Sequence, residues 1–313
     1  MAIITTVPRQ RNQEIIWQSG SFSYRVHMEW GKWLGDWIYR LGGEQLSGLC
    51  CDDNGLVYAL TRMQDVGIVV FSQEGQPLRT FGAGLFCHAH MMRMSPRGTL
   101  WAADDRGHII IELTTEGKVL RKLGTGKPSD SGYEGSAPWP EDLKSIKRAA
   151  PPFNRPTSLF EKADGTLLAS DGYANVSVHR FLADGTLAST WGKPGTDPGT
   201  FRLPHSVWVD ARDRVWIADR ENNRIEIFTQ EGGLLADFEG LLYPSDFWSD
   251  GTWMYVAEAM GGISIFDMDL NLVSQLGHYN SQLQTHTMCG NSKGDLFLGI
   301  MSQPHKLVKL ERL

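Results

Sequence analysis

A repeated pattern of short β-type runs organises most of this 313-residue chain. Each copy has an apolar run such as GLVYAL or GTLWAAD, then a turn, and then a second run that ends in Phe or Leu. Six copies follow one another about 40 to 45 residues apart, the length of a four-stranded propeller blade. Since helical periodicity is nearly absent, the sequence predicts an all-β fold, a six-bladed β-propeller. The first runs of the six copies span residues 55–60, 98–104, 165–171, 213–219, 251–258 and 294–300.

The sixth copy shows only three strands before Leu313, so its blade needs an outer strand from elsewhere. The segment SYRVHMEW (23–30) is the natural donor. We therefore expect residues 1–45 to form an N-terminal strap with a closing strand, and residues 46–313 to form the propeller. Residues 125–152 are rich in Pro, Gly and Ser and form an insertion between copies two and three. Loops of this length often act as lids.

Composition and charge exclude several classes of function. The formal net charge is −6, from 30 Lys+Arg against 36 Asp+Glu, which argues against nucleic-acid or anionic-membrane partners. No stretch approaches 18 apolar residues, and the first residues lack the pattern of a secretion signal. The four cysteines form neither a disulfide framework nor a CxxC zinc pattern. We expect a cytoplasmic protein with reduced thiols.

Three histidines occupy the same position of the repeat. His90, His205 and His286 each lie eight residues before the first run of copies two, four and six. In a six-bladed propeller, alternate blades would direct these imidazoles at the central channel. Three neutral histidines with an open fourth position suit Zn²⁺ or another divalent metal. The competing explanation is that each is an ordinary core histidine. His88, two residues before His90, shares its strand face.

A second set of polar residues follows at the end of the same strand. Arg62 and Arg220 lie fifteen residues after the histidine position, in copies one and four, and Tyr173 lies sixteen after it. Two guanidinium groups over a metal would bind a carboxylate and favour a phenol as a base. The alternative explanation for the two arginines is that they form surface ion pairs. Acidic residues also lie fourteen residues after the histidine position, and hydrogen bonds within turns explain them. Those acidic residues are Asp104, Asp171 and Asp219.

Four sequence runs together resemble a known family. They are RPTSLF (155–160), ASDGYANVSVHRF (169–181), GTFRLPHSVWV (199–209) and WIADRENNRIEIF (216–228). They closely resemble NHL-repeat propellers of the peptidyl-α-hydroxyglycine α-amidating lyase type, in particular its small bacterial relatives. The similarity covers about residues 45–313, and PHS with ADREN is its most specific part.

The resemblance implies a zinc-dependent reaction at the same residues. Tyr173 matches the proposed base of the family, and Arg62 and Arg220 match the arginines that surround the substrate. The family reaction cleaves the C–N bond of an N-(α-hydroxyalkyl) amide into a primary amide and an aldehyde such as glyoxylate. The positions that match the three zinc-binding histidines are His90, His205 and His286.

This sequence also departs from the family pattern. The third histidine motif reads QTHT (284–287), so Thr287 replaces an Asp that binds the family's structural calcium, and we do not expect calcium here. Gln284 replaces a Met beside the metal, and His90 sits in CHAH instead of PHG. Side chains that we expect next to the metal ligands are His88, Gln284, Thr287 and Asp219.

Three functions remain open on this evidence. The first is a metal-dependent lyase for a carbinolamide-like small molecule that carries a carboxylate or amide. The second is a metal-dependent hydrolase for an amide or lactone, in which water activated by the metal is the nucleophile. The third is a non-catalytic NHL propeller that serves as a binding platform, because a fold does not fix a function.

Overall fold

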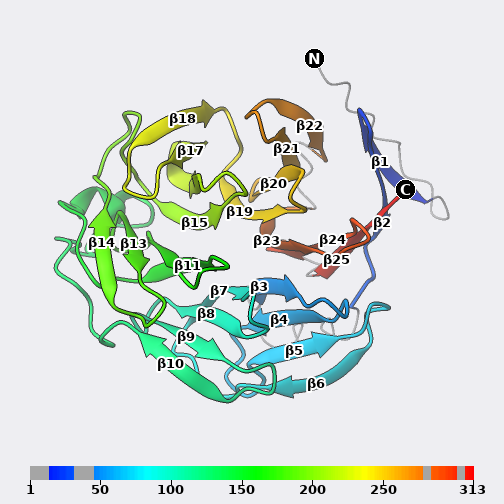
Figure 1. The fold of residues 1–313 in the computed structure, drawn as a ribbon, viewed down its shortest axis with the longest axis horizontal. Coiled ribbons are helices and arrows are strands. Elements are labelled where there is room, and N and C mark those ends of the chain that lie inside the picture. The colour runs from blue at the N-terminus through cyan, green and yellow to red at the C-terminus, as the bar shows by residue number, and fades with distance from the viewer. Residues whose placement is uncertain (1–13, 32–45, 278–282, 302–306) are drawn as a thin grey trace. The chain divides into compact units, whose positions relative to one another are not determined.

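The computed structural model describes residues 14–31, 46–277, 283–301 and 307–313. These described residues form six sheets, five with four strands and one with five, and two short 3₁₀ helices (Figure 1). The fold is the predicted all-β, six-bladed β-propeller. The two short helices are η1 (Glu141–Ser145) and η2 (Arg220–Asn222).

The strands divide between two compact units, and each unit is described by itself. The first unit comprises Met1–Thr80 and Asp246–Leu313, and the second comprises Phe81–Ser245. The predicted division into a strap (1–45) and a propeller (46–313) stays a prediction, and much of the strap lies outside the described residues.

Three sheets belong to the first unit. The first sheet contains β3 (Leu46–Cys51), β4 (Val57–Thr61), β5 (Ile68–Phe71) and β6 (Pro77–Phe81). The second contains β19 (Pro244–Ser249), β20 (Trp253–Glu258), β21 (Ile263–Asp267) and β22 (Leu272–Leu276). The five-stranded sheet has the order β1 (Ile15–Ser19), β2 (Phe22–His27), β25 (Leu307–Arg312), β24 (Leu296–Ile300) and β23 (Thr285–Gly290).

Three further sheets belong to the second unit, and they carry most of the candidate site. The first contains β7 (Ala89–Met94), β8 (Leu100–Asp104), β9 (Ile109–Leu113) and β10 (Val119–Leu123). The second contains β11 (Pro156–Glu161), β12 (Leu167–Asp171), β13 (Ser177–Phe181) and β14 (Leu187–Trp191). The third contains β15 (Pro204–Val209), β16 (Val215–Asp219), β17 (Arg224–Phe228) and β18 (Leu234–Glu239).

Burial falls from the inner strands to the outer strands of each sheet. Every residue of β4, β8, β12, β16 and β24 is buried, whereas β6 and β18 are largely exposed. Both faces of these second strands are therefore covered by neighbouring parts of the fold. Each fully buried aliphatic side chain there stabilises the fold by about 1.5–3 kcal/mol.

The N-terminal region completes the last sheet, as predicted. β2 pairs with β25, with Tyr24 opposite Arg312 and Val26 opposite Leu310. The strand covers Phe22–His27 and so ends before residue 30. β1, which the sequence analysis did not anticipate, adds a fifth strand through a hairpin at Gly20, whose φ of 58° suits glycine.

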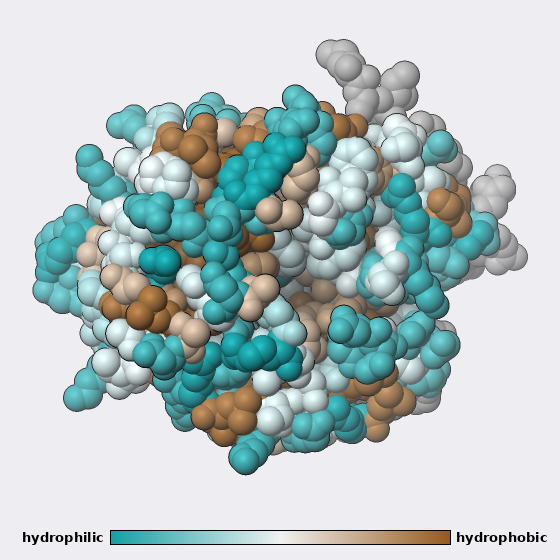
Figure 2. Space-filling view, viewed as in Figure 1, coloured by the Kyte–Doolittle hydropathy of each residue, from teal (hydrophilic) through white to brown (hydrophobic). Residues whose placement is uncertain are grey.

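The visible surface is mixed in character. Figure 2 shows one face on which hydrophilic residues predominate and hydrophobic ones form small separate areas. No helix among the described residues is long and apolar enough to cross a membrane. The expected cytoplasmic location stays a prediction.

Candidate active site

Two of the predicted metal ligands are held in the same way in the second unit. His90 and His205 are each the second residue of an inner strand, β7 and β15, and both are fully buried. Nδ1 of His90 lies 2.6 Å from the carbonyl oxygen of Thr157, and Nδ1 of His205 lies 2.7 Å from that of Ser245. A carbonyl oxygen only accepts, so each Nδ1 carries the proton and donates it. In its neutral form, each ring therefore presents the lone pair of Nε2.

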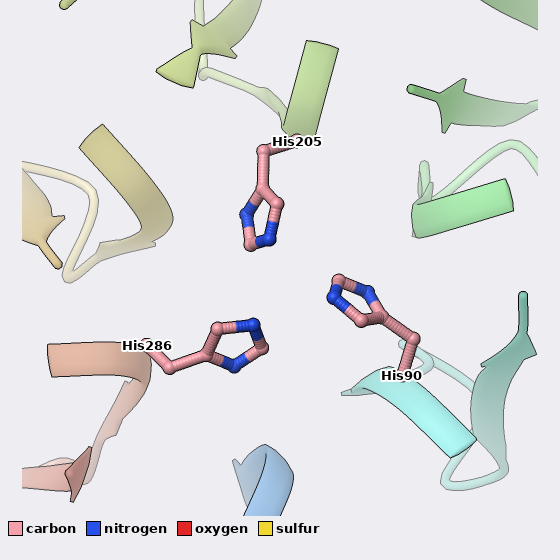
Figure 3. A group of neighbouring side chains, drawn as sticks. All are labelled: His90, His205 and His286. Carbon is pink, nitrogen blue, oxygen red and sulfur yellow. The ribbon is translucent and has the colours of Figure 1, made fainter. Parts of the chain in front are cut away.

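The third predicted ligand belongs to the first unit. His286 is the second residue of β23 and is 4% exposed. Figure 3 draws its ring together with those of His90 and His205, and its role as the third metal ligand stays a prediction. Three neutral imidazoles are a typical ligand set for a catalytic zinc ion.

The hydroxyl of Tyr173 faces both of the paired histidines. Tyr173 follows β12, and its Oη lies 3.0 Å from Nε2 of His90 and 3.1 Å from Nε2 of His205. Two imidazole nitrogens thus face the same phenol oxygen from two different strands. A bound cation would satisfy both lone pairs at once, so the donor set fits a divalent metal.

Arg220 contacts the same hydroxyl group of Tyr173. It begins η2 directly after β16 and is 9% exposed. Its Nη1 donates to Tyr173 Oη at 3.4 Å, and its Nε donates to Glu221 at 3.1 Å. A guanidinium therefore faces the oxygen that lies against two candidate metal ligands, where a substrate carboxylate would find a partner.

A second guanidinium beside Tyr173 comes from a residue that the sequence analysis missed. The guanidinium carbon of Arg155 lies 5.2 Å from the Tyr173 ring centre, and its Nη2 donates to Asp105 Oδ2 at 2.7 Å. Asp105 is fully buried and also lies 2.5 Å from His88 Nδ1. Burial alone would raise the pKa of Asp105, but the hydrogen bond from His88 and nearby positive charges hold this pKa well below its usual range.

The insertion adds an aromatic ring to the site. Trp139 lies with its ring centre 5.6 Å from that of Tyr173, and the Arg220 guanidinium carbon lies 5.7 Å from the Trp139 ring. It is 45% exposed. That residues 125–152 act as a lid stays a prediction.

The remaining predicted residues have different surroundings. His88 contacts Asp105 and not a metal ligand. Thr287 Oγ1 donates to Asp246 Oδ2 at 2.9 Å and accepts from the Leu49 amide at 3.1 Å. Gln284 is half-buried, and its carbonyl accepts from the amide of Met301. Arg62 is half-buried directly after β4 in the first unit, and its role at the site stays a prediction.

The aspartates at the fourteenth repeat position accept backbone hydrogen bonds from the loop before the first strand. Oδ1 of Asp219 accepts from the amides of Arg202 and Leu203, both at 3.0 Å, and the Arg224 guanidinium lies 3.2 Å from its Oδ2. These carboxylates fix the loops that lead to the histidines. The corresponding bonds run from Cys87 and His88 to Asp104, and from Asn154 to Asp171.

Comparisons with known proteins agree with the fold. The NHL repeat family matches residues 201–228, which include β15 to β17 and His205. Residues 201–228 thus match an NHL repeat, and the curated relatives of the chain include amidating lyases, as the sequence resemblance indicated.

Individual relatives are distant. A probable peptidyl-α-hydroxyglycine α-amidating lyase of Caenorhabditis elegans is 26% identical over 59% of this chain and 55% of its own length. NHL repeat-containing protein 3 of Homo sapiens is 26% identical over 70% of this chain and 60% of its own. The chain thus spans 60% or less of the length of these relatives. A gluconolactonase of Xanthomonas campestris has a TM-score of 0.66 at 12% identity over 100% of both chains, which shows the fold alone.

Proposed function

We propose that this protein is a metal-dependent lyase that cleaves the C–N bond of an N-(α-hydroxyalkyl) amide. The products are a primary amide and an aldehyde, such as glyoxylate when the substrate carries a carboxylate. The observation that carries the proposal is the position of one phenol oxygen, 3.0 and 3.1 Å from the Nε2 atoms of two buried histidines. The amidating lyases among the relatives support this class of reaction.

The metal would be held by His90, His205 and His286. A zinc ion bound there supplies Lewis-acid polarisation of a substrate oxygen. The carbonyl groups of Thr157 and Ser245 orient two of the rings through their Nδ1–H groups, which leaves both Nε2 lone pairs for the ion. Calcium is not part of the proposal.

Tyr173 would move the proton of the reaction. Its phenolate oxygen takes the proton of the substrate hydroxyl while the C=O bond of the aldehyde forms and the C–N bond breaks. The electron pair of that bond goes to the amide nitrogen, which receives the same proton from Tyr173. No oxidant, reductant or water is consumed. The Arg220 guanidinium, 3.4 Å from Tyr173 Oη, faces the oxygen where negative charge develops and can bind the substrate carboxylate.

Glyoxylate release from an N-acyl-α-hydroxyglycine tests the proposal. The zinc-loaded protein is expected to release one glyoxylate for each primary amide formed, and chelation should stop the reaction. Hydrolysis of a lactone or amide without glyoxylate would replace the lyase with the hydrolase. A protein that takes up neither metal nor substrate would be a binding platform.

A further inference from the structure

Trp139 is an exposed aromatic residue in contact with the two residues that the proposed reaction uses. Its ring lies 5.6 Å from that of Tyr173 and 5.7 Å from the Arg220 guanidinium carbon. It comes from the insertion and not from a blade strand, and 45% of it is exposed. An indole ring in this position offers an apolar, planar surface next to the reacting atoms.

The segment that carries Trp139 is anchored to the loop of Tyr173. Ser131 Oγ donates to the carbonyl of Ala174 at 2.6 Å, directly after Tyr173. Asn175 Nδ2 donates to the carbonyl of Ala150 at 2.6 Å, near the other end of the insertion. The indole and the phenol are therefore carried by segments that are hydrogen-bonded to each other.

Apolar packing holds the middle of the insertion in the same place. Leu143 and Ile146 are each 4% exposed and belong to the core cluster that also contains Val176 and Phe201. Leu143 lies only four residues after Trp139. A segment with buried side chains this close to Trp139 holds the indole over the phenol, so its exposed surface is a fixed feature of the site.

The other neighbours of Tyr173 are polar and offer little surface to an apolar part of a substrate. Arg155 contacts the Tyr173 ring as an ion pair with Asp105, and His90 and His205 present nitrogen lone pairs. Among these described neighbours Trp139 alone offers a large apolar surface that is still exposed. An apolar part of a substrate whose carboxylate lies at Arg220 would therefore contact the indole.

We propose that Trp139 is the specificity-determining residue of this site and that it selects substrates with a planar apolar acyl group, such as an aroyl group, on the amide nitrogen. This inference rests on the proposed function. The aroyl ring stacks on the indole while the carboxylate on the α-carbon pairs with Arg220. Favourable aromatic contacts of this kind change affinity by about tenfold.

The test compares N-benzoyl- and N-acetyl-α-hydroxyglycine as substrates of the zinc-loaded protein. We expect kcat/KM to favour the benzoyl compound by about tenfold. Trp139→Ala should lower kcat/KM for the benzoyl compound more than for the acetyl compound and so remove that preference, and Trp139→Phe should retain it. The matched control is Leu235→Ala, which removes an apolar residue of similar exposure (52%) on β18. An equal loss for both substrates in Trp139→Ala, or an unchanged ratio, would overturn the proposal.

A binding measurement separates this inference from the lyase reaction itself. N-benzoylglycine and N-acetylglycine lack the hydroxyl group and cannot react, so calorimetry reports recognition alone. Preference for N-benzoylglycine in the wild type and its loss in Trp139→Ala would support the role of Trp139 even if no glyoxylate is released. Equal affinity of the wild type for both compounds would overturn that role, whether or not the lyase reaction is observed.

Discussion

Replacing Tyr173 with Phe removes one oxygen atom and leaves the aromatic contacts of the ring in place. That oxygen has three neighbours, Nε2 of His90 at 3.0 Å, Nε2 of His205 at 3.1 Å and Nη1 of Arg220 at 3.4 Å. If it is the proton carrier, general acid–base catalysis predicts a loss of about 10²- to 10⁴-fold in kcat, or about 3–5 kcal/mol.

The same variant should leave the fold and the metal site intact. The imidazoles supply the metal ligands, so zinc content should match that of the wild type. The hydrogen bonds lost are worth about 0.5–1.5 kcal/mol each in stability, so the free energy of unfolding should fall by no more than about 4 kcal/mol and the variant should still fold. Tyr58→Phe is the matched control, because it removes a phenol that donates to Asp52 at 3.2 Å outside the site.

Glyoxylate formation by zinc-loaded protein, measured by a coupled assay, gives kcat for each variant. Tyr173→Phe should be at least about 100-fold slower, while Tyr58→Phe should be unchanged. If Tyr173→Phe keeps more than about a tenth of the wild-type kcat, the phenol is not the proton carrier. Loss of zinc in Tyr173→Phe would instead show that the phenol holds the metal site together.

Three further substitutions test neighbouring parts of the account. His205→Ala should leave zinc bound at less than about a tenth of an ion per chain, measured by plasma mass spectrometry after dialysis, because open zinc sites use three protein ligands. Asp105→Asn should lower the free energy of unfolding in urea by about 2–3 kcal/mol, since it leaves Arg155 and His88 without a carboxylate; an unchanged midpoint would contradict this. Glu226→Gln should raise stability at pH 8 by up to about 3 kcal/mol, because burial, only partly offset by the Gly199 amide, raises the pKa of Glu226 to about 7. The folded wild type binds this proton more tightly than the unfolded chain, so its stability should fall as the pH rises from about 4.5 to about 7, and the variant should lack that fall.

The repeat made the fold predictable from the sequence. Each blade has the same order of runs and turns, so the spacing alone indicated six sheets and a missing outer strand. The strand β1 was not predicted, because it belongs to no repeat and pairs with β2 through the Gly20 hairpin. The complete burial of the second strands also escaped notice, because both faces are covered only once the sheets are placed.

The site residues that lie at repeat positions could be predicted from the sequence, and the other site residues could not. His90, His205 and His286 share one offset, so spacing identified them together. Asp105 lies at the same repeat position as Arg220. Its ion pair, however, is with Arg155 of the next sheet, and the spacing of residues within one copy does not reveal a contact between sheets. The insertion has no repeat phase, so only its contacts show that Trp139 reaches Tyr173.

Zinc stoichiometry of the purified protein tests the central claim most directly. The measurement is plasma mass spectrometry on protein equilibrated with Zn²⁺ and then dialysed, with His90→Ala as the paired variant. The account predicts one zinc ion per wild-type chain and almost none in the variant, because His90 is one of the three proposed histidine ligands. A folded wild-type protein that retains no zinc, or a variant that retains as much as the wild type, would contradict it.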